Sequence, residues 1–121
     1  MKWLSVLPAV STAAAVLATA GTAAAPPVGT LPAGPVAKIE TKKGQLVAVA
    51  LPHRANGRVW RVARAFDARV LRQVSEADVG SQVVLVFRAA GAGKTTLAFG
   101  LTLGERARAY ESRRFVVTVR P

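Results

Sequence analysis

Residues 82–101 read QVVLVFRAAGAGKTTLAFGL, two apolar runs on either side of a glycine-rich segment. In each run an apolar side chain recurs at every second position; these are Val83, Leu85 and Phe87, then Leu97, Phe99 and Leu101. Apolar residues at every second position lie on the same face of a β-strand, and that face packs against a core. The stretch therefore predicts two strands, Gln82–Arg88 and Thr95–Leu101, joined by a glycine hairpin loop.

The same pattern continues on both sides of this stretch. Runs rich in β-branched residues cover Gln45–Leu51 and Arg114–Arg120. Turn signals separate the runs at Gly44, Asn56-Gly57, Gly80, Gly91–Gly93 and Gly104. Short strands and turns at this spacing predict an all-β sandwich of about seven strands that spans Ala37–Arg120.

The segment Arg58–Ser75 fits two interpretations. Its arginines at positions 58, 61, 64, 69 and 72 share one arc of a helical wheel, which is typical of a basic amphipathic helix that binds membranes or nucleic acid. Asp67 lies within the apolar arc, however, and β-branched residues are frequent. We therefore predict two strands, Arg58–Ala65 and Val70–Ser75, joined by a turn at Phe66–Ala68.

The composition bounds the chemistry that the chain can perform. Its 121 residues are 51% apolar, enough for one small folded domain, and 17 Lys and Arg residues outnumber 6 Asp and Glu residues. With no cysteine, neither a disulfide nor a thiolate nucleophile can form, and His53 is the single histidine. We therefore expect no enzymatic activity, no metal and no cofactor, and we assign His53 no catalytic role.

Residues 89–96 are similar to a phosphate-binding P-loop but lack two of its parts. The template requires a glycine where this chain has Arg88. A strand pattern follows Thr96, whereas the P-loop requires a helix N-terminus to hold the phosphates. The segment is therefore interpreted as a loop between strands.

The N-terminus has the pattern of a signal peptide. A basic Met1-Lys2 precedes the uncharged stretch Trp3–Leu17, and Ala18-Thr19-Ala20 supplies a small-x-small cleavage site. We expect a signal peptide over residues 1–20 and export to the periplasm or the medium, with cleavage after Ala25 as the alternative. An uncleaved membrane anchor is less favoured because no positively charged stretch follows the apolar run.

Residues 21–36 hold four of the seven prolines, together with many Ala and Gly residues. Such a composition is typical of an extended linker. The expected organisation is a signal peptide (1–20), a Pro/Gly/Ala-rich linker (21–36) and one β-sandwich domain (37–121).

Five features follow one another along the expected domain. They are Gly44-Gln45 at a strand start, Gly57 followed by Trp60, the segment Asp67–Ser75 with its Val-Leu and Val-Ser pairs, Phe87–Gly91, and the last strand Arg114–Val119. Over about residues 39–121 this order resembles the chagasin family of cysteine-peptidase inhibitors. The resemblance implies an immunoglobulin-like β-sandwich, with three loops at one end that enter the active-site cleft of a papain-like cysteine peptidase. Trp60 is expected in the core between the sheets.

By this resemblance the first loop is His53–Gly57, the second Glu76–Gly80 and the third Thr102–Tyr110. The family motif N-P-T-T-G before x-x-W retains Gly57 and Trp60, G-x-G-G retains Gly80, and R-P-W retains nothing. The third loop instead carries Arg and Tyr side chains, which interface hot spots favour. The residues expected to contact the peptidase are His53, Arg54, Ala55, Asn56, Gly57, Gly80, Leu103, Gly104 and Arg106. The expected inhibitor is a monomer.

The net charge of +11 supports a second hypothesis of a different class. A basic domain outside the cell is attracted to polyanions, with an affinity that falls as salt rises. The alternative function is thus a binding module for an anionic polysaccharide or envelope surface that has lost peptidase inhibition. Sequence-specific binding of nucleic acid is not expected, because neither a recognition helix nor a stacking platform is evident.

Overall fold

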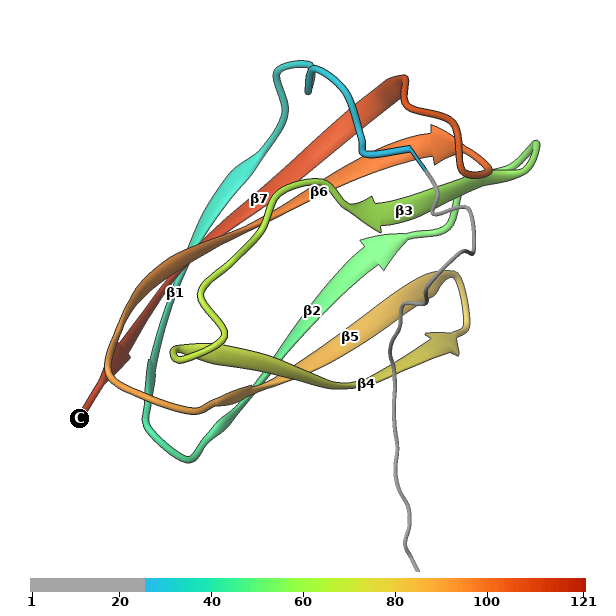
Figure 1. The fold of residues 1–121 in the computed structure, drawn as a ribbon. Coiled ribbons are helices and arrows are strands. Elements are labelled where there is room, and N and C mark those ends of the chain that lie inside the picture. The colour runs from blue at the N-terminus through green and yellow to red at the C-terminus, as the bar shows by residue number, and fades with distance from the viewer. Residues whose placement is uncertain (1–25) are drawn as a thin grey trace, which may run out of the picture.

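A computed structural model describes residues 26–121, which form seven β-strands and, within this range, no helix (Figure 1). The strands are β1 Val36–Lys42, β2 Leu46–Pro52, β3 Arg58–Val62, β4 Leu71–Val79, β5 Gln82–Ala89, β6 Gly93–Leu103 and β7 Ala109–Arg120. The predicted signal peptide and both of its candidate cleavage sites lie outside the described residues. Between residues 26 and 121 there is no helix long and apolar enough to cross a membrane.

The strands form two sheets packed face to face. One has four strands in the order β1-β7-β6-β3, and the other has three in the order β2-β5-β4. β1 pairs in parallel with β7, and every other pair is antiparallel. The predicted all-β, immunoglobulin-like sandwich is confirmed.

The core lies between the inner faces of the two sheets, where the predicted alternation of apolar residues is confirmed. Phe87, Phe99, Leu97, Leu101 and Val117 are at most 1% exposed. The two buried phenylalanines each make an edge-to-face contact, Phe87 with Phe66 at 5.7 Å and Phe99 with Phe115 at 6.0 Å between ring centroids. Such pairs add directional packing to the apolar burial.

The segment Arg58–Ser75 forms two strands, as predicted, but their bounds differ. β3 ends at Val62, and residues 63–70 cross from one sheet to the other. β4 begins at Leu71 and continues to Val79, because it pairs with β5 over nearly its whole length. Phe66 reaches the core from the crossing segment, which explains the apolar residue at that position.

The glycine segment between β5 and β6 is not the predicted hairpin loop. Its two flanking strands belong to different sheets, so residues 90–92 cross the sandwich edge. Gly91 allows the crossing, since a Cβ there would lie 2.5 Å from the Arg69 carbonyl oxygen. A strand follows it and not a helix, which excludes a P-loop.

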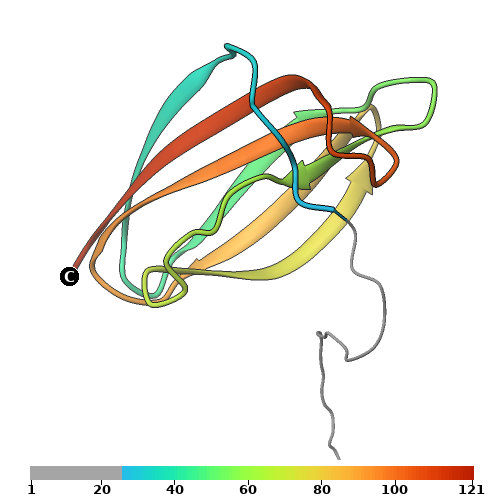
Figure 2. The same cartoon turned by 45° about the horizontal axis from the view of Figure 1, so that its top comes forward.

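Residues 26–35 of the expected linker lie against the outer face of the four-stranded sheet (blue in Figure 2). Val28 is 6% exposed, the Ser112 hydroxyl donates to the Pro32 carbonyl at 2.7 Å, and the Arg114 amide donates to the Pro35 carbonyl at 3.0 Å. We call residues 26–35 the strap. The strap leads into β1, a strand that the weak alternation of VAKIETK did not single out.

Successive strands alternate in direction, so the connections β2–β3, β4–β5 and β6–β7 share one end of the sandwich (Figure 1). The connections β1–β2, β3–β4 and β5–β6 share the other end. The C-terminus lies at this second end, far from the first three connections (Figure 1).

Candidate binding site

Three loops meet at the end of the sandwich opposite the C-terminus. The first loop is residues 53–57, the second is the turn 80–81, and the third is residues 104–108; together we call them the loop end. The Gly104 amide donates to the Gly57 carbonyl at 3.1 Å, and the His53 amide donates to the Ser81 carbonyl at 2.9 Å. The backbone therefore joins the first loop directly to both of the others.

An ion pair also ties the first loop to the start of β7. The Arg54 guanidinium donates to both Glu111 carboxylate oxygens, at 2.8 and 3.0 Å. These bonds hold the pKa of Glu111 below its usual range and raise the pKa of Arg54. Arg54, expected to contact a peptidase, thus uses its planar guanidinium within the chain, where it fixes the position of the first loop.

The first loop closes in the left-handed backbone region. Asn56 has φ 66° and Gly57 has φ 75°. Glycine adopts this region freely, and asparagine is one of the few other residues that does so. The sequence Asn56-Gly57 therefore ends the loop as a turn, as its turn signal predicted.

The second loop is much shorter than the predicted Glu76–Gly80. Residues 76–79 belong to β4, and Val79 pairs with Gln82. Only Gly80, with φ 61°, and Ser81 remain between the strands. Pairing with β5 fixes Glu76 and Asp78 on the strand, so the second loop offers little more than the exposed Gly80.

The third loop is also shorter than the predicted Thr102–Tyr110, because Leu103 ends β6 and Ala109 begins β7. Gly104 has φ 58°, and its carbonyl accepts a hydrogen bond from the Thr102 hydroxyl at 2.7 Å. The Arg106 amide donates to the Leu103 carbonyl at 3.2 Å. Internal hydrogen bonds therefore fold this loop tightly.

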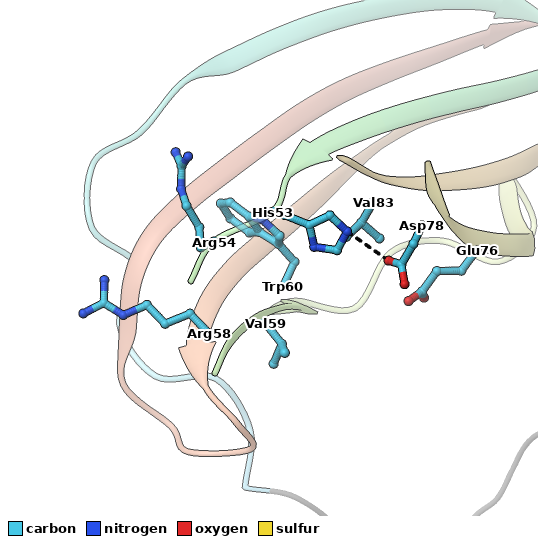
Figure 3. Close-up of a pocket in the computed structure, with 8 residues that line it drawn as sticks. All are labelled: His53, Arg54, Arg58, Val59, Trp60, Glu76, Asp78 and Val83. Carbon is cyan, nitrogen blue, oxygen red and sulfur yellow. Dashed lines mark ion pairs between the residues drawn. The ribbon is translucent and has the colours of Figure 1, made fainter. Parts of the chain in front are cut away.

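Beside the first loop, a hollow of about 250 Å³ opens between β3 and the β4–β5 hairpin (Figure 3). Its lining residues are His53, Arg54, Arg58, Val59, Trp60, Glu76, Asp78 and Val83. His53 Nε2 lies 3.1 Å from Asp78 Oδ1, while Arg54 and Arg58 extend away from that pair (Figure 3). The hollow combines an aromatic wall with charges of both signs.

The prediction that Trp60 lies in the core between the sheets is wrong: its side chain lies at the margin of the core. It is half-buried, packs against the core cluster and lines the hollow. β3 is an edge strand, and the positions of β4 that share the inner face beside it carry Glu76 and Asp78, so no apolar side chain of β4 covers Trp60. The indole Nε1 donates to the Pro52 carbonyl at 2.8 Å and so links the two sheets.

Two arginines stack on one tyrosine at the loop end. The guanidinium carbons of Arg58 and Arg108 lie 4.2 and 4.8 Å from the centre of the Tyr110 ring. The sequence indicated the Arg and Tyr content of the third loop but not the part of Arg58. No local pattern could show it, because the contact depends on the pairing of β3 with β6 and of β6 with β7.

The residues expected to contact a peptidase therefore lie at the same end of the sandwich, although the second and third loops are shorter than predicted. Residues 53–57, Gly80, Gly104 and Arg106 lie in the three loops, and Leu103 is the last residue of β6, directly before the third loop. Within residues 26–121, no group of three His, Asp or Glu side chains could hold a metal ion.

Comparison with known proteins gives one informative result. No family model matches the sequence, and no curated protein is similar to it. Among solved structures, the chain is similar to a cysteine protease inhibitor from Entamoeba histolytica, with 13% identity and a TM-score of 0.55. The match covers 74% of this chain and 99% of the other. At this identity the likeness shows that the two chains share a fold.

Proposed function

We propose that the chain is an exported inhibitor of papain-like cysteine peptidases, whose loop end occupies the active-site cleft. The observation that carries the proposal is the joining of three loops by hydrogen bonds at one end of this fold. Support comes from the shared fold with a protein described as a cysteine protease inhibitor. Such an inhibitor blocks access to the cleft and performs no reaction itself.

Rigid loops favour this kind of binding. Association costs free energy for every loop and side chain that must be ordered on contact. Here the first loop is fixed by Arg54 and by two backbone bonds, and the third loop is folded on itself. The loop end therefore loses little conformational freedom on binding.

The Arg58–Tyr110–Arg108 cluster replaces the missing aromatic anchor of the third loop. Tyr and Arg dominate interface hot spots because they combine large contact area with hydrogen bonding. Stacking of the two guanidinium groups on the ring restricts the orientation of Tyr110. We infer that this cluster, next to Gly104 and Arg106, makes the main contact with the peptidase.

The experiment is a titration of papain with the whole chain, following hydrolysis of a peptide substrate. We expect reversible inhibition that is competitive with substrate. Papain whose active-site cysteine carries a covalent peptidyl inhibitor should not bind, because its cleft is filled. Absence of inhibition, or equal binding to the blocked enzyme, would contradict the proposal.

A matched pair of double variants identifies the contact. Replacing Arg58 and Arg108 by alanine should weaken inhibition by about 10- to 100-fold. Replacing Lys38 and Arg120 by alanine removes the same charge from a different face and should change it by less than about threefold. Equal losses in the two variants would show that charge alone attracts the peptidase.

A second candidate function is supported by one face of the four-stranded sheet. Strand register places five cations on the outer side of β1, β6 and β7, namely Lys38, Lys42, Lys94, Arg114 and Arg120. Glu40 is the one acid that shares this side, and the ion pairs of the described residues involve none of the five cations. We call this surface the basic face.

The basic face fits an anionic polysaccharide, because its charges are spread over neighbouring strands and none of them is neutralised by an ion pair among the described residues. The test is elution of the whole chain from dextran sulfate beads in a salt gradient. Replacing Lys38, Lys94 and Arg120 by alanine should lower the eluting salt concentration more than replacing Arg58, Arg106 and Arg108. The opposite order would overturn this second candidate.

A further inference from the structure

The strap packs closely on the sheet at two glycines, one on the sheet and one on the strap. Gly100 of β6 faces the strap, and a Cβ there would lie 2.9 Å from Val28 and 3.1 Å from Leu31. On the strap itself, a Cβ on Gly34 would collide with the Ser112 carbonyl. Glycines on both sides of the contact indicate that the strap binds the sheet in one defined position.

Side chains beneath the strap are buried although they lie on the outer face of the sheet. Ala98 is 4% exposed, Thr102 is fully buried and Ser112 is 1% exposed. Outer positions of a sandwich normally face water, as Lys94 and Thr96 do nearer the start of β6. The strap therefore completes the domain at the half of the sheet next to the loop end.

Arg61 connects the strap to the third loop. From β3, its guanidinium donates to the Arg106 carbonyl of the third loop at 2.9 Å and also to the Pro26 carbonyl of the strap. A second link is direct, since the Gly29 amide donates to the Ala107 carbonyl at 2.7 Å. Two adjacent carbonyls of the third loop are thus held from outside the loop.

We propose that Arg61 and the strap hold the third loop in its binding conformation, so that the strap is a fourth element of the loop end. This inference rests on the proposed function. Arg61 acts as a positioning residue, because its guanidinium donates to backbone carbonyls on both sides. Without these bonds the third loop keeps its contact residues but samples more conformations, and binding must then order it.

The experiment measures amide hydrogen exchange and papain inhibition for the whole chain and two variants. Arg61→Gln shortens the bridging side chain, and Val28→Asp places a carboxylate under the strap and displaces it. In both variants, exchange of the Gly104 and Arg106 amides should accelerate by about tenfold or more. Inhibition should weaken by about 5- to 20-fold, although no contact side chain has changed.

Arg72→Gln is the matched control, because Arg72 lies on β4 and bonds within its own neighbourhood, to the Ala68 carbonyl at 3.4 Å. Arg72→Gln should leave both amide exchange and papain inhibition unchanged.

Unchanged exchange of the Gly104 and Arg106 amides in Arg61→Gln and Val28→Asp would overturn the inference. Faster exchange with unchanged inhibition would also overturn it, since the bracing would then have no part in binding. If the unsubstituted chain does not inhibit papain, the proposed function fails, whereas the exchange data still decide whether the strap braces the loop.

Discussion

Trp60 joins the two sheets where the sandwich is open. Its ring packs against the core margin, its Nε1–H bonds to the Pro52 carbonyl on the opposite sheet, and the guanidinium carbon of Arg113 lies 5.9 Å from its ring centre. A half-buried tryptophan contributes less than a fully buried one. Both the packing of the Trp60 ring and its one hydrogen bond therefore contribute to the free energy of unfolding.

This division can be measured with two substitutions. Trp60→Ala should lower the free energy of unfolding by about 2 to 3 kcal/mol, because packing and hydrogen bond are both lost. Trp60→Phe keeps most of the packing and should cost about 1 kcal/mol. Urea unfolding followed by circular dichroism gives both values. Equal losses would mean that the hydrogen bond, and not the ring, carries the effect.

The Arg54–Glu111 pair gives the loop end a pH dependence. The pKa of Glu111 is lowered chiefly by hydrogen bonding to Arg54, so the pair stabilises the fold above the usual glutamate pKa of about 4.3. This stabilisation is lost as the pH falls through the lowered pKa.

Glu111→Gln should therefore destabilise the chain at pH 7, and the difference from the unsubstituted chain should shrink below about pH 4. Thermal unfolding of both chains from pH 3 to 7 measures this difference in stability. Glu105→Gln is the control, because Glu105 lies in the third loop and takes part in none of the ion pairs of the described residues. A difference for Glu111→Gln that stays constant with pH would contradict the assignment.

At the scale of elements, β4 is a nine-residue edge strand with one side open. Exposed edges invite pairing with another chain, and proteins prevent it with bulges and inward-pointing charges. β4 has both, an irregular register between Gln73 and Ser75 and the inward carboxylates Glu76 and Asp78. These acids explain why the hollow stays open beside Trp60.

Removing both carboxylates should therefore promote association. We expect Glu76→Val with Asp78→Val to form dimers or larger species in size-exclusion chromatography with light scattering. Glu105→Val with Glu40→Val removes the same charge elsewhere and should leave the molecular mass unchanged. A monomeric double β4 variant would show that the bulge suffices to protect the edge.

Local pattern predicted the elements that depend on local chemistry. Apolar alternation and β-branched residues predicted six of the strands, because side chains on a half-buried strand follow a period of two and β-branched residues favour strands. Glycines marked the turns at 57, 80 and 104 because each has positive φ there. The predicted hairpin between β5 and β6 is wrong, since a glycine segment does not show which sheet the next strand joins.

The strap shows why the remaining features could not be predicted. Its composition is that of a linker, yet its carbonyls find donors more than thirty residues away, on Arg61, Arg64 and Ser112. Long-range contacts of this kind leave no periodicity in the sequence. The same holds for the Arg58–Tyr110 stacking, which exists only through strand pairing.

At the scale of the whole molecule, the two candidate surfaces are separate. The loop end lies at one end of the sandwich, and the basic face covers the outer side of β1, β6 and β7. Binding to each should respond differently to salt, because affinity for a polyanion depends on released counterions.

We expect retention on dextran sulfate to be lost steeply between about 0.05 and 0.5 M NaCl, while papain inhibition changes by less than about fivefold. Both are measured on the same whole-chain preparation. A parallel fall of the two affinities would mean that papain is bound through charge and not through fitted loops.

The central claim, that the loop end enters the peptidase cleft, is tested most directly by hydrogen exchange of the chain with and without papain. Binding should slow exchange in residues 53–57, 80–81 and 104–108, and should leave β1 and residues 90–92 unchanged. Papain with a covalently filled cleft should give no protection. Protection of β1 and β7 without the three loops, or no protection at any site, would contradict the account.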